Sequence, residues 1–308
     1  MQKLVGALSI TLALALVPSR AVHAQASDSV YTAAECPSCA TWNAATPGVR
    51  LFGNTYYVGT RGLSSILITS SGGHVLIDGG LPQSAPRIVA NIRALGFRVE
   101  DIKLILNSHM HYDHAGGIAA LQRASGARVA ASPAARRALE AGEVMADDPQ
   151  FAFGKEHNEF PAVKDVREVA DGQELSVGKL RITAHFTPGH TPGGTSWTWT
   201  SCEGATCLSM VYADSLNSVS APGFKFSGDA THPSLVPVFQ HSIDVVAALK
   251  CDILLAPHPE LIDLDAKLAA RAGNAAVNPF IDSKACVAYA QGARQRLEKR
   301  IAEEGAQK

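Results

Sequence analysis

The sequence contains no run of Lys or Arg residues and no basic stripe, so nothing in it indicates a nucleic-acid partner. Charged residues make up only 18% of its 308 residues, hydrophobic residues make up 46%, and the formal net charge is −1. This composition is too apolar for a disordered chain. No internal repeat, low-complexity tract or long linker appears either. After its first residues, the chain is therefore expected to fold as a single globular domain.

The start of the chain has the pattern of a secretory signal peptide. The apolar run from Leu4 to Val17 follows Lys3, and Val22-His23-Ala24 offers a cleavage site. This segment is too short and wrongly flanked for a membrane anchor, although a buried N-terminal helix is the alternative. No other stretch is long and apolar enough to span a bilayer. We predict a signal peptide at residues 1–24, one domain at residues 25–308, and a periplasmic mature protein with no membrane contact.

The six cysteines are an even number behind a signal peptide, which favours disulfides because an exported chain meets an oxidising compartment. Six cysteines allow 15 pairings. The pairs 36/39 and 202/207 are each close enough to close small loops, which leaves Cys251 with Cys286. The alternative for Cys36-Pro37-Ser38-Cys39 is a redox or metal-binding CxxC motif. That alternative lacks the βαβ context of a thioredoxin-like motif and a second pair of the same kind.

Apolar runs typical of strands alternate with helical patterns, which indicates an α/β protein. Two sheets with helices on their outer faces would bury such runs. The strand-like runs are 65–69, 74–78, 102–107, 128–131, 180–186, 195–200, 208–212 and 252–256. The segments with apolar residues at three- and four-residue spacing are 85–95, 117–125, 133–141, 235–249 and 285–302.

The densest group of metal-ligand side chains directly follows the strand-like run 102–107. It consists of His109, His111, Asp113 and His114. Loops at strand ends commonly display binding groups, and alternate residues such as His109 and His111 can point to one side of an extended loop. Imidazoles with a carboxylate suit zinc, with iron or manganese less favoured. We therefore predict that all four side chains bind metal.

Further polar groups stand at the ends of other apolar runs. His190 lies in a Pro- and Gly-rich turn after run 180–186, Asp214 and Ser215 follow run 208–212, and His258 follows run 252–256 between two prolines. Such placement is expected of a site assembled at one edge of two sheets. We predict that His190 and His258 are also ligands. A lone histidine is usually a surface or hydrogen-bonded residue, which is our interpretation of the others: His74, His157, His185, His232 and His241.

The pattern His109-x-His111-x-Asp113-His114, with T-P-G-H-T-P-G around His190, resembles the metallo-β-lactamase superfamily. This resemblance implies a four-layer αβ/βα sandwich, with two mixed sheets, helices on the outer faces and a two-zinc site between the sheets. Segments 212–224 and 251–259 are similar to class B β-lactamases of the third subclass. Cys251 and Cys286 match the disulfide of that subclass. The resemblance extends from about residue 42 to residue 302.

The resemblance implies a role for each site residue. The first zinc would be bound by His109, His111 and His190, and the second by Asp113, His114 and His258. Ser215 stands where other subclasses have a metal-binding cysteine, so it is expected to contact substrate instead, together with Asn217 and with Gln150 as a weaker candidate. For Asp214 the resemblance implies a structural or supporting role, whereas thioesterase relatives have a bridging aspartate in this region.

The function implied is that of a zinc-dependent β-lactamase, in which metal-bound hydroxide attacks the β-lactam amide and confers antibiotic resistance. Asp113 is the catalytic side chain, because it would position the water and relay a proton. The sequence lacks an S-x-x-K motif followed by K-T-G, so an acyl-enzyme is not expected. The alternatives are a secreted lactonase or thioester hydrolase on the same site, or a zinc-binding protein without catalysis. The only partner indicated is a small-molecule β-lactam, and no obligatory protein partner is evident.

Overall fold

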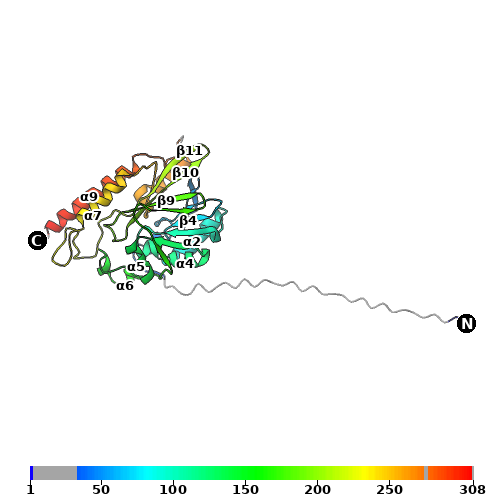
Figure 1. Ribbon diagram of the computed structural model, residues 1–308, viewed down its shortest axis with the longest axis horizontal. Coiled ribbons are helices and arrows are strands. Elements are labelled where there is room, and N and C mark those ends of the chain that lie inside the picture. Colours follow the sequence, from blue (N-terminus) through cyan, green and yellow to red (C-terminus); the bar gives the residue numbers. More distant parts are fainter. Residues whose placement is uncertain (3–32, 274–276, 307–308) are drawn as a thin grey trace. The chain divides into compact units, whose positions relative to one another are not determined.

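The computed structural model describes residues 1–2, 33–273 and 277–306 (Figure 1). The predicted signal peptide lies outside the described residues apart from its first two positions, so it stays a prediction. Residues 33–273 and 277–306 belong to one compact unit, which is described below. In the described ranges no helix is long and apolar enough to cross a membrane.

Two mixed sheets form the centre of this unit. In the first sheet, neighbours from β1 to β4 pair antiparallel and neighbours from β4 to β7 pair parallel, in chain order. Its strands are β1 (Val49–Phe52), β2 (Thr55–Tyr57), β3 (Ile66–Ile68), β4 (His74–Ile77), β5 (Ile102–Leu106), β6 (Arg128–Ala131) and β7 (Val166–Glu168). The second sheet has the order β12-β11-β10-β9-β8, with only β11 and β12 parallel. Its strands are β8 (Glu174–Val177), β9 (Leu180–Phe186), β10 (Thr195–Glu203), β11 (Thr206–Tyr212) and β12 (Ile253–Leu255).

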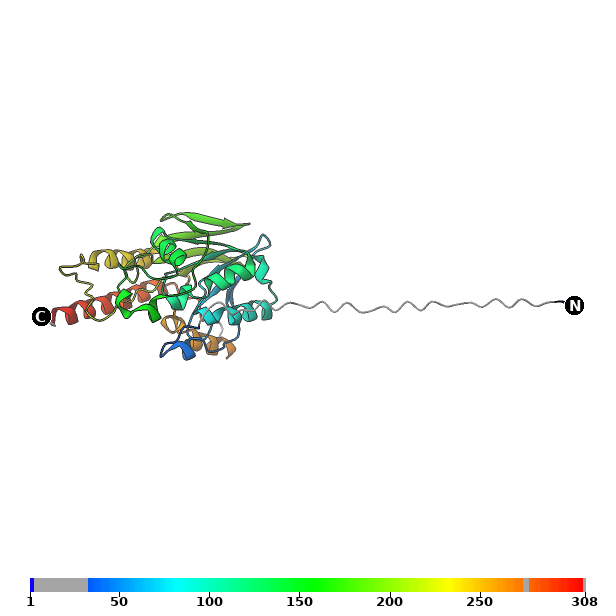
Figure 2. The same cartoon turned by 90° about the horizontal axis from the view of Figure 1, so that it is seen from below.

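Helices cover the outer face of each sheet (Figures 1 and 2). Helices α2 (Ala85–Ala94), α4 (Ile118–Ser125) and α5 (Pro133–Ala141) pack on the first sheet, whereas α7 (Val236–Ala248) and α9 (Ala285–Ala306) lie side by side against the second. The other helices are α1 (Cys39–Trp42), α3 (Tyr112–Ala115), α6 (Lys155–Asn158), α8 (Leu264–Ala272) and the 3-10 turns η1 (Pro82–Ser84), η2 (Val99–Asp101), η3 (Phe151–Phe153) and η4 (Pro259–Ile262). The predicted four-layer αβ/βα sandwich is confirmed.

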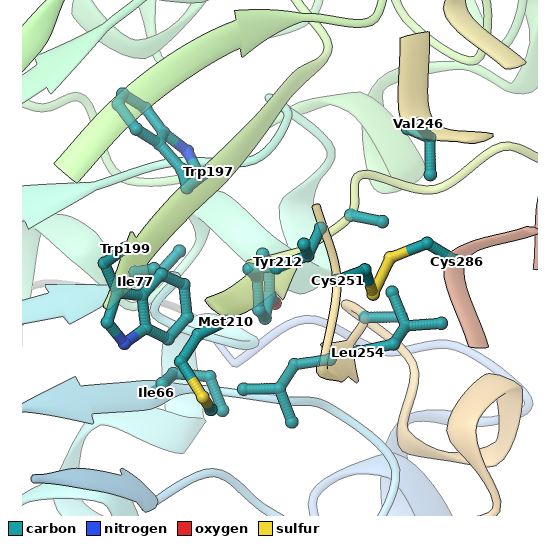
Figure 3. Close-up of a cluster of buried hydrophobic side chains, with 14 of the residues drawn as sticks. Ile66, Ile77, Trp197, Trp199, Met210, Tyr212, Val246, Cys251, Leu254 and Cys286 are labelled. Atoms are coloured by element: carbon teal, nitrogen blue, oxygen red, sulfur yellow. A yellow bond between two sulfur atoms is a disulfide. The ribbon is translucent and has the colours of Figure 1, made fainter. Parts of the chain in front are cut away.

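Alternation along the strands of the first sheet creates two apolar layers. In β3, Ile66 and Ile68 face the second sheet, whereas Leu67 between them faces α2 and α4. Successive strand residues point to opposite faces, so a strand buried on both sides is apolar throughout. Figure 3 shows Ile66 in the layer between the sheets with Trp199 and Met210 of the second sheet. This apolar layer packs the two sheets against each other, so the loops that follow their strands and carry the candidate ligands have a rigid support.

All six cysteines are paired in the structure. The disulfides join Cys36 to Cys39, Cys202 to Cys207 and Cys251 to Cys286. With Cys36 and Cys39 joined, neither sulfur is a free thiolate, so the metal-binding alternative for this pair is not supported, whereas a redox CxxC motif forms the same disulfide in its oxidised state. The Cys251–Cys286 disulfide joins the segment before β12 to the start of α9 (Figure 3).

Candidate metal centre

The loop after β5 carries the predicted ligands and is held in place by a buried aspartate. Asp78, directly after β4, has φ 61°, a left-handed conformation that is uncommon outside glycine. One of its oxygens accepts from the Ser108 amide at 2.7 Å, and the other accepts from the Ser108 and Tyr212 hydroxyls at 2.6 and 2.7 Å. The next residue, Gly79, leaves no room for a side chain, because an added Cβ would lie 2.6 Å from the Ile118 amide nitrogen. This turn therefore supports the metal-binding loop.

The first group of ligands consists of His109, His111 and His190. One ligand atom from each lies within 4.8 Å of the others, and all three side chains are buried. His109 and His111 come from the loop after β5, whereas His190 comes from the turn after β9. Segments of two different sheets therefore meet at the site, as the sequence predicted.

Each imidazole of this first group is oriented through its outer ring nitrogen. His109 Nδ1 lies 2.8 Å from Asp214 Oδ1, and His111 Nε2 lies 3.1 Å from Asp148 Oδ1. His190 Nδ1 donates to a backbone carbonyl, that of Asn217, at 2.8 Å. A hydrogen bond at the outer nitrogen fixes the ring and its tautomer and leaves the other nitrogen for a metal.

The second group brings Asp113, His114 and His258 together. Asp113 Oδ2 lies 3.2 Å from His114 Nε2 and 3.5 Å from His258 Nε2, and the two imidazole nitrogens are 3.3 Å apart. His109 also lies close, since one ligand atom from each of His109, Asp113 and His114 is within 4.8 Å of the others. The two groups are therefore adjacent.

These residues fit a metal ion of the zinc type. Tetrahedral zinc with bonds of 2.0–2.1 Å places its ligand atoms about 3.3 Å apart, which is the spacing that the second group shows. In the first group, His109 Nε2 is buried and has no hydrogen-bond partner among the described residues. Because a buried polar atom is normally satisfied, this nitrogen is explained by a metal.

The electrostatics of the metal-free site also favour metal binding. Burial, reinforced by His111, lowers the pKa of His190 to about 3, and burial with His114 lowers that of His258 to about 4. Burial alone would raise the pKa of Asp113, but the positive charge and hydrogen bond of His114 outweigh it and hold the pKa below its ordinary value. At neutral pH His190 and His258 are therefore neutral imidazoles and Asp113 is an ionised carboxylate, which are the protonation states that metals bind. Burial would lower the pKa of His114, but the charge and hydrogen bond of Asp113 raise it, so a metal bound at His114 would displace a proton from this imidazole.

The predicted substrate contacts line the same cavity as the ligands. This cavity has a volume of about 370 Å³, and its wall includes Ser215, Asn217 and Gln150 together with five of the six predicted ligands. The sixth, His114, is fully buried behind them. Ser215 Oγ is buried without a hydrogen-bond partner among the described residues, which leaves it available to a bound molecule.

Sequence reasoning missed four contributors to this site. Asp148 supports His111, and the Trp42 ring packs on His258 with their centroids 5.4 Å apart. The Cys36 end of the first disulfide lines the cavity, and so does His157, which we had interpreted as an ordinary surface or hydrogen-bonded residue. The regular spacing and strand-end position that identified the ligands are absent from these residues, so no sequence signal marked them.

Comparisons with known proteins agree with this geometry. A family model described as the metallo-beta-lactamase superfamily matches residues 58–201. Among solved structures, the Rm3 metallo-β-lactamase is 55% identical with a TM-score of 0.84, covering 88% of this chain and 99% of its own. MEM-A1, a subclass B3 metallo-β-lactamase from a soil metagenome library, is 49% identical with a TM-score of 0.83, covering 87% of this chain and 100% of its own.

Curated relatives match over shorter stretches. A probable metallo-hydrolase of Burkholderia pseudomallei is 33% identical over 110 residues, which are 35% of this chain and 34% of the relative. A hydroxyacylglutathione hydrolase of Anaeromyxobacter dehalogenans is 32% identical over 133 residues, 43% of this chain and 40% of the relative. The chain thus spans only about a third to two fifths of the length of these two relatives. The near-complete matches to solved structures decide the family: this chain belongs to the metallo-β-lactamase superfamily, within its subclass B3.

Proposed function

We propose that this protein is a zinc-dependent β-lactamase, which hydrolyses the amide bond of the β-lactam ring and confers resistance to β-lactam antibiotics. The observation that carries this proposal is the set of six candidate ligand side chains gathered at one cavity, five in its wall and His114 buried behind them. The β-lactamases named above, which resemble this chain over nearly their whole length, support the choice of substrate. The lactonases and thioesterases among the curated relatives match over much shorter stretches.

The site has ligands for two zinc ions. When bound, zinc would polarise the amide carbonyl and lower the pKa of a water molecule toward neutrality. We assign the first ion to the group that Asp214, Asp148 and the Asn217 carbonyl orient, and the second to the group around Asp113. The six ligands are His109, His111 and His190 for the first ion, and Asp113, His114 and His258 for the second.

The remaining work falls to side chains of this chain. Asp113 uses Oδ2 toward the two imidazoles beside it, which leaves Oδ1 to orient the attacking water and to hold its proton. The Ser215 hydroxyl and the Asn217 amide, which line the cavity, would donate hydrogen bonds to the carboxylate of a β-lactam. Gln150, which also lines the cavity, would contact the rest of the substrate.

A substrate comparison on one zinc-loaded sample tests this proposal. We expect turnover of a penicillin, a cephalosporin or a carbapenem, and turnover of an N-acyl homoserine lactone or a thioester at least about a hundredfold slower. The reason is that a site built to hydrogen-bond a substrate group rejects compounds that leave its polar groups unpaired. The measurement is kcat/KM for each compound. A lactone or thioester preferred over every β-lactam would overturn the proposal, and no turnover at all would leave a zinc-binding protein without catalysis.

Export to the periplasm is a second part of the proposal. The three disulfides are consistent with an oxidising compartment. When the full-length chain is expressed in a Gram-negative host, the intact mass of the periplasmic protein is expected to correspond to a chain starting at Gln25 and lacking six thiol hydrogens. A mass that retains residues 1–24, or six thiols that react with an alkylating reagent before reduction, would contradict this expectation.

A further inference from the structure

One face of the C-terminal helix α9 holds the loop that carries the substrate-side residues. The loop in question runs from residue 214 to residue 227, and we call it the 214–227 segment. Four side chains of α9 contact it, at positions seven, four and four residues apart, so they form one stripe along the helix. These residues are Tyr289, Arg296, Arg300 and Glu304.

Tyr289 holds the backbone on both sides of Ser215. Its hydroxyl donates to the Asp214 carbonyl at 2.8 Å and accepts from the Leu216 amide at 3.3 Å. The ring is buried, and all of these groups lie in the protein interior. A single oxygen atom of α9 therefore joins the backbone on both sides of Ser215.

Two arginines continue the contact along the helix. Arg296 Nη2 lies 3.4 Å from the Leu216 carbonyl, and the Ser218 hydroxyl donates to the Arg296 carbonyl at 3.3 Å. Arg300 Nη2 donates to the Ser220 hydroxyl and to the Phe224 carbonyl, both at 2.8 Å. A guanidinium is a planar fork of donors, so it can fix two points of a loop at once.

Glu304 completes the stripe at the far end of the segment. Its two oxygens accept from the Phe226 and Ser227 amides at 2.8 and 2.9 Å. Arg300 Nε also donates to this carboxylate at 2.8 Å, so the pair acts as one unit. Glu304 is only 5% exposed, which shows that these contacts are part of the interior and not a surface ion pair.

The segment held in this way contacts both the metal ligands and the cavity. The Asn217 carbonyl accepts from His190 Nδ1, and Ser215, Asn217 and Val219 line the cavity. The helix itself is fixed at its start by the disulfide from Cys286 to Cys251, just before β12. One end of α9 is thus tied to the second sheet, and the rest of its length supports the segment.

We propose that this stripe of α9 is a positioning element for the substrate side of the site. By fixing the backbone of the 214–227 segment, it sets Ser215 and Asn217 before substrate arrives, so that less ordering is needed on binding. This inference rests on the proposed function, because it assigns substrate contacts to that segment. Tyr289, Arg300 and Glu304 are then positioning residues that act through the loop and touch no reacting atom.

Two variants and a matched control test the proposal. Tyr289→Phe removes one oxygen, and Arg300→Ala removes the guanidinium fork. The control is Arg294→Ala, on the same helix, where Arg294 forms a 2.6 Å ion pair with Asp244 of α7, outside the segment. The readouts are backbone hydrogen exchange of peptides within 214–227, zinc content, thermal midpoint, and KM and kcat for a chromogenic cephalosporin.

For both variants we expect exchange within the segment to be about tenfold faster, and KM to rise about tenfold, which is the size of one or two lost hydrogen bonds. The kcat value should stay within about twofold and zinc content should be unchanged, while Arg300→Lys should recover part of the loss. Arg294→Ala should match the wild type in exchange and KM.

The proposal is overturned if exchange and KM in the variants equal those of Arg294→Ala, or if only the thermal midpoint falls. If Arg300→Ala does not fold, Tyr289→Phe still decides the question, because it changes a single atom. The exchange measurement needs no substrate. A wild-type protein that hydrolyses no β-lactam would therefore defeat the proposed function while the exchange result still showed whether α9 orders the segment.

Discussion

Treatment with a zinc chelator is expected to abolish β-lactam hydrolysis, and added zinc is expected to restore it. Lewis-acid activation commonly supplies several kcal/mol, and about 4 kcal/mol corresponds to about a thousandfold in rate. The Ser215 hydroxyl in the cavity wall does not replace this activation, because it is not hydrogen-bonded to a base among the described residues.

The metal-free protein should remain folded at pH 7 and be ready to bind zinc again. Burial keeps His190 and His258 neutral there, since their pKa values lie at about 3 and about 4. The hydrogen bonds from His109 to Asp214 and from His190 to the Asn217 carbonyl do not depend on a metal. Loss of activity should therefore precede any loss of secondary structure.

The measurement is initial rate against zinc content by elemental analysis, with circular dichroism on the same samples. A serine-directed acylating inhibitor serves as the control and should leave the rate of the zinc-loaded protein unchanged. Full activity in protein shown to contain no metal would refute the metal mechanism. Unfolding at the same chelator concentration as the activity loss would show instead that zinc holds the fold together.

The sequence predicts the layers of this fold well where burial is complete. Strands β3 to β6 are apolar on both faces, and the long helices α2, α5 and α7 have clear three- and four-residue spacing. Strands β1, β2, β7 and β8 were not predicted. They lie at or near sheet edges and are short or partly exposed, so their apolar pattern is weak. Helix α8 was not predicted either, because its apolar pattern is also weak: Leu264 is the only buried residue of this helix.

The site divides in a similar way. The sequence marks its six candidate ligands, because these histidines and this aspartate cluster in sequence or stand at strand ends. Their supports could not be found. Asp148 reaches His111 across 37 positions of the chain, and Tyr289 reaches Asp214 across 75. Such contacts depend on how loops fold back in space, which local spacing does not encode.

The last prediction separates the residues that bind metal from those that bind substrate. His258→Ala is expected to weaken the second zinc and to lower kcat strongly. His258 Nε2 lies 3.5 Å from Asp113 Oδ2 and 3.3 Å from His114 Nε2, so its loss removes one of the three side chains of that ligand group. Changes in groups that merely support a ligand commonly lower the metal affinity about tenfold to a hundredfold, and the loss of a ligand should lower it by no less.

Ser215→Ala is the matched comparison and should leave both zinc ions bound. A neutral hydroxyl is a poor zinc ligand beside imidazole and carboxylate. Ser215 Oγ has no hydrogen-bond partner among the described residues, so its removal breaks no hydrogen bond among them, and Ser215 lies in the cavity wall where substrate would bind. The effect should therefore appear in KM, as a lost hydrogen bond to a charged group of about 1.5–3 kcal/mol at most.

Metal content and steady-state kinetics on the same two variants decide between the roles. A His258→Ala protein with about one zinc and a low kcat, beside a Ser215→Ala protein with two zinc ions and a raised KM, is the expected pair of results. If Ser215→Ala instead loses a zinc equivalent while His258→Ala keeps two, the assignment of the second metal is wrong. The ligand group would then have to be built around His109, Asp113 and His114, whose ligand atoms also lie within 4.8 Å of one another.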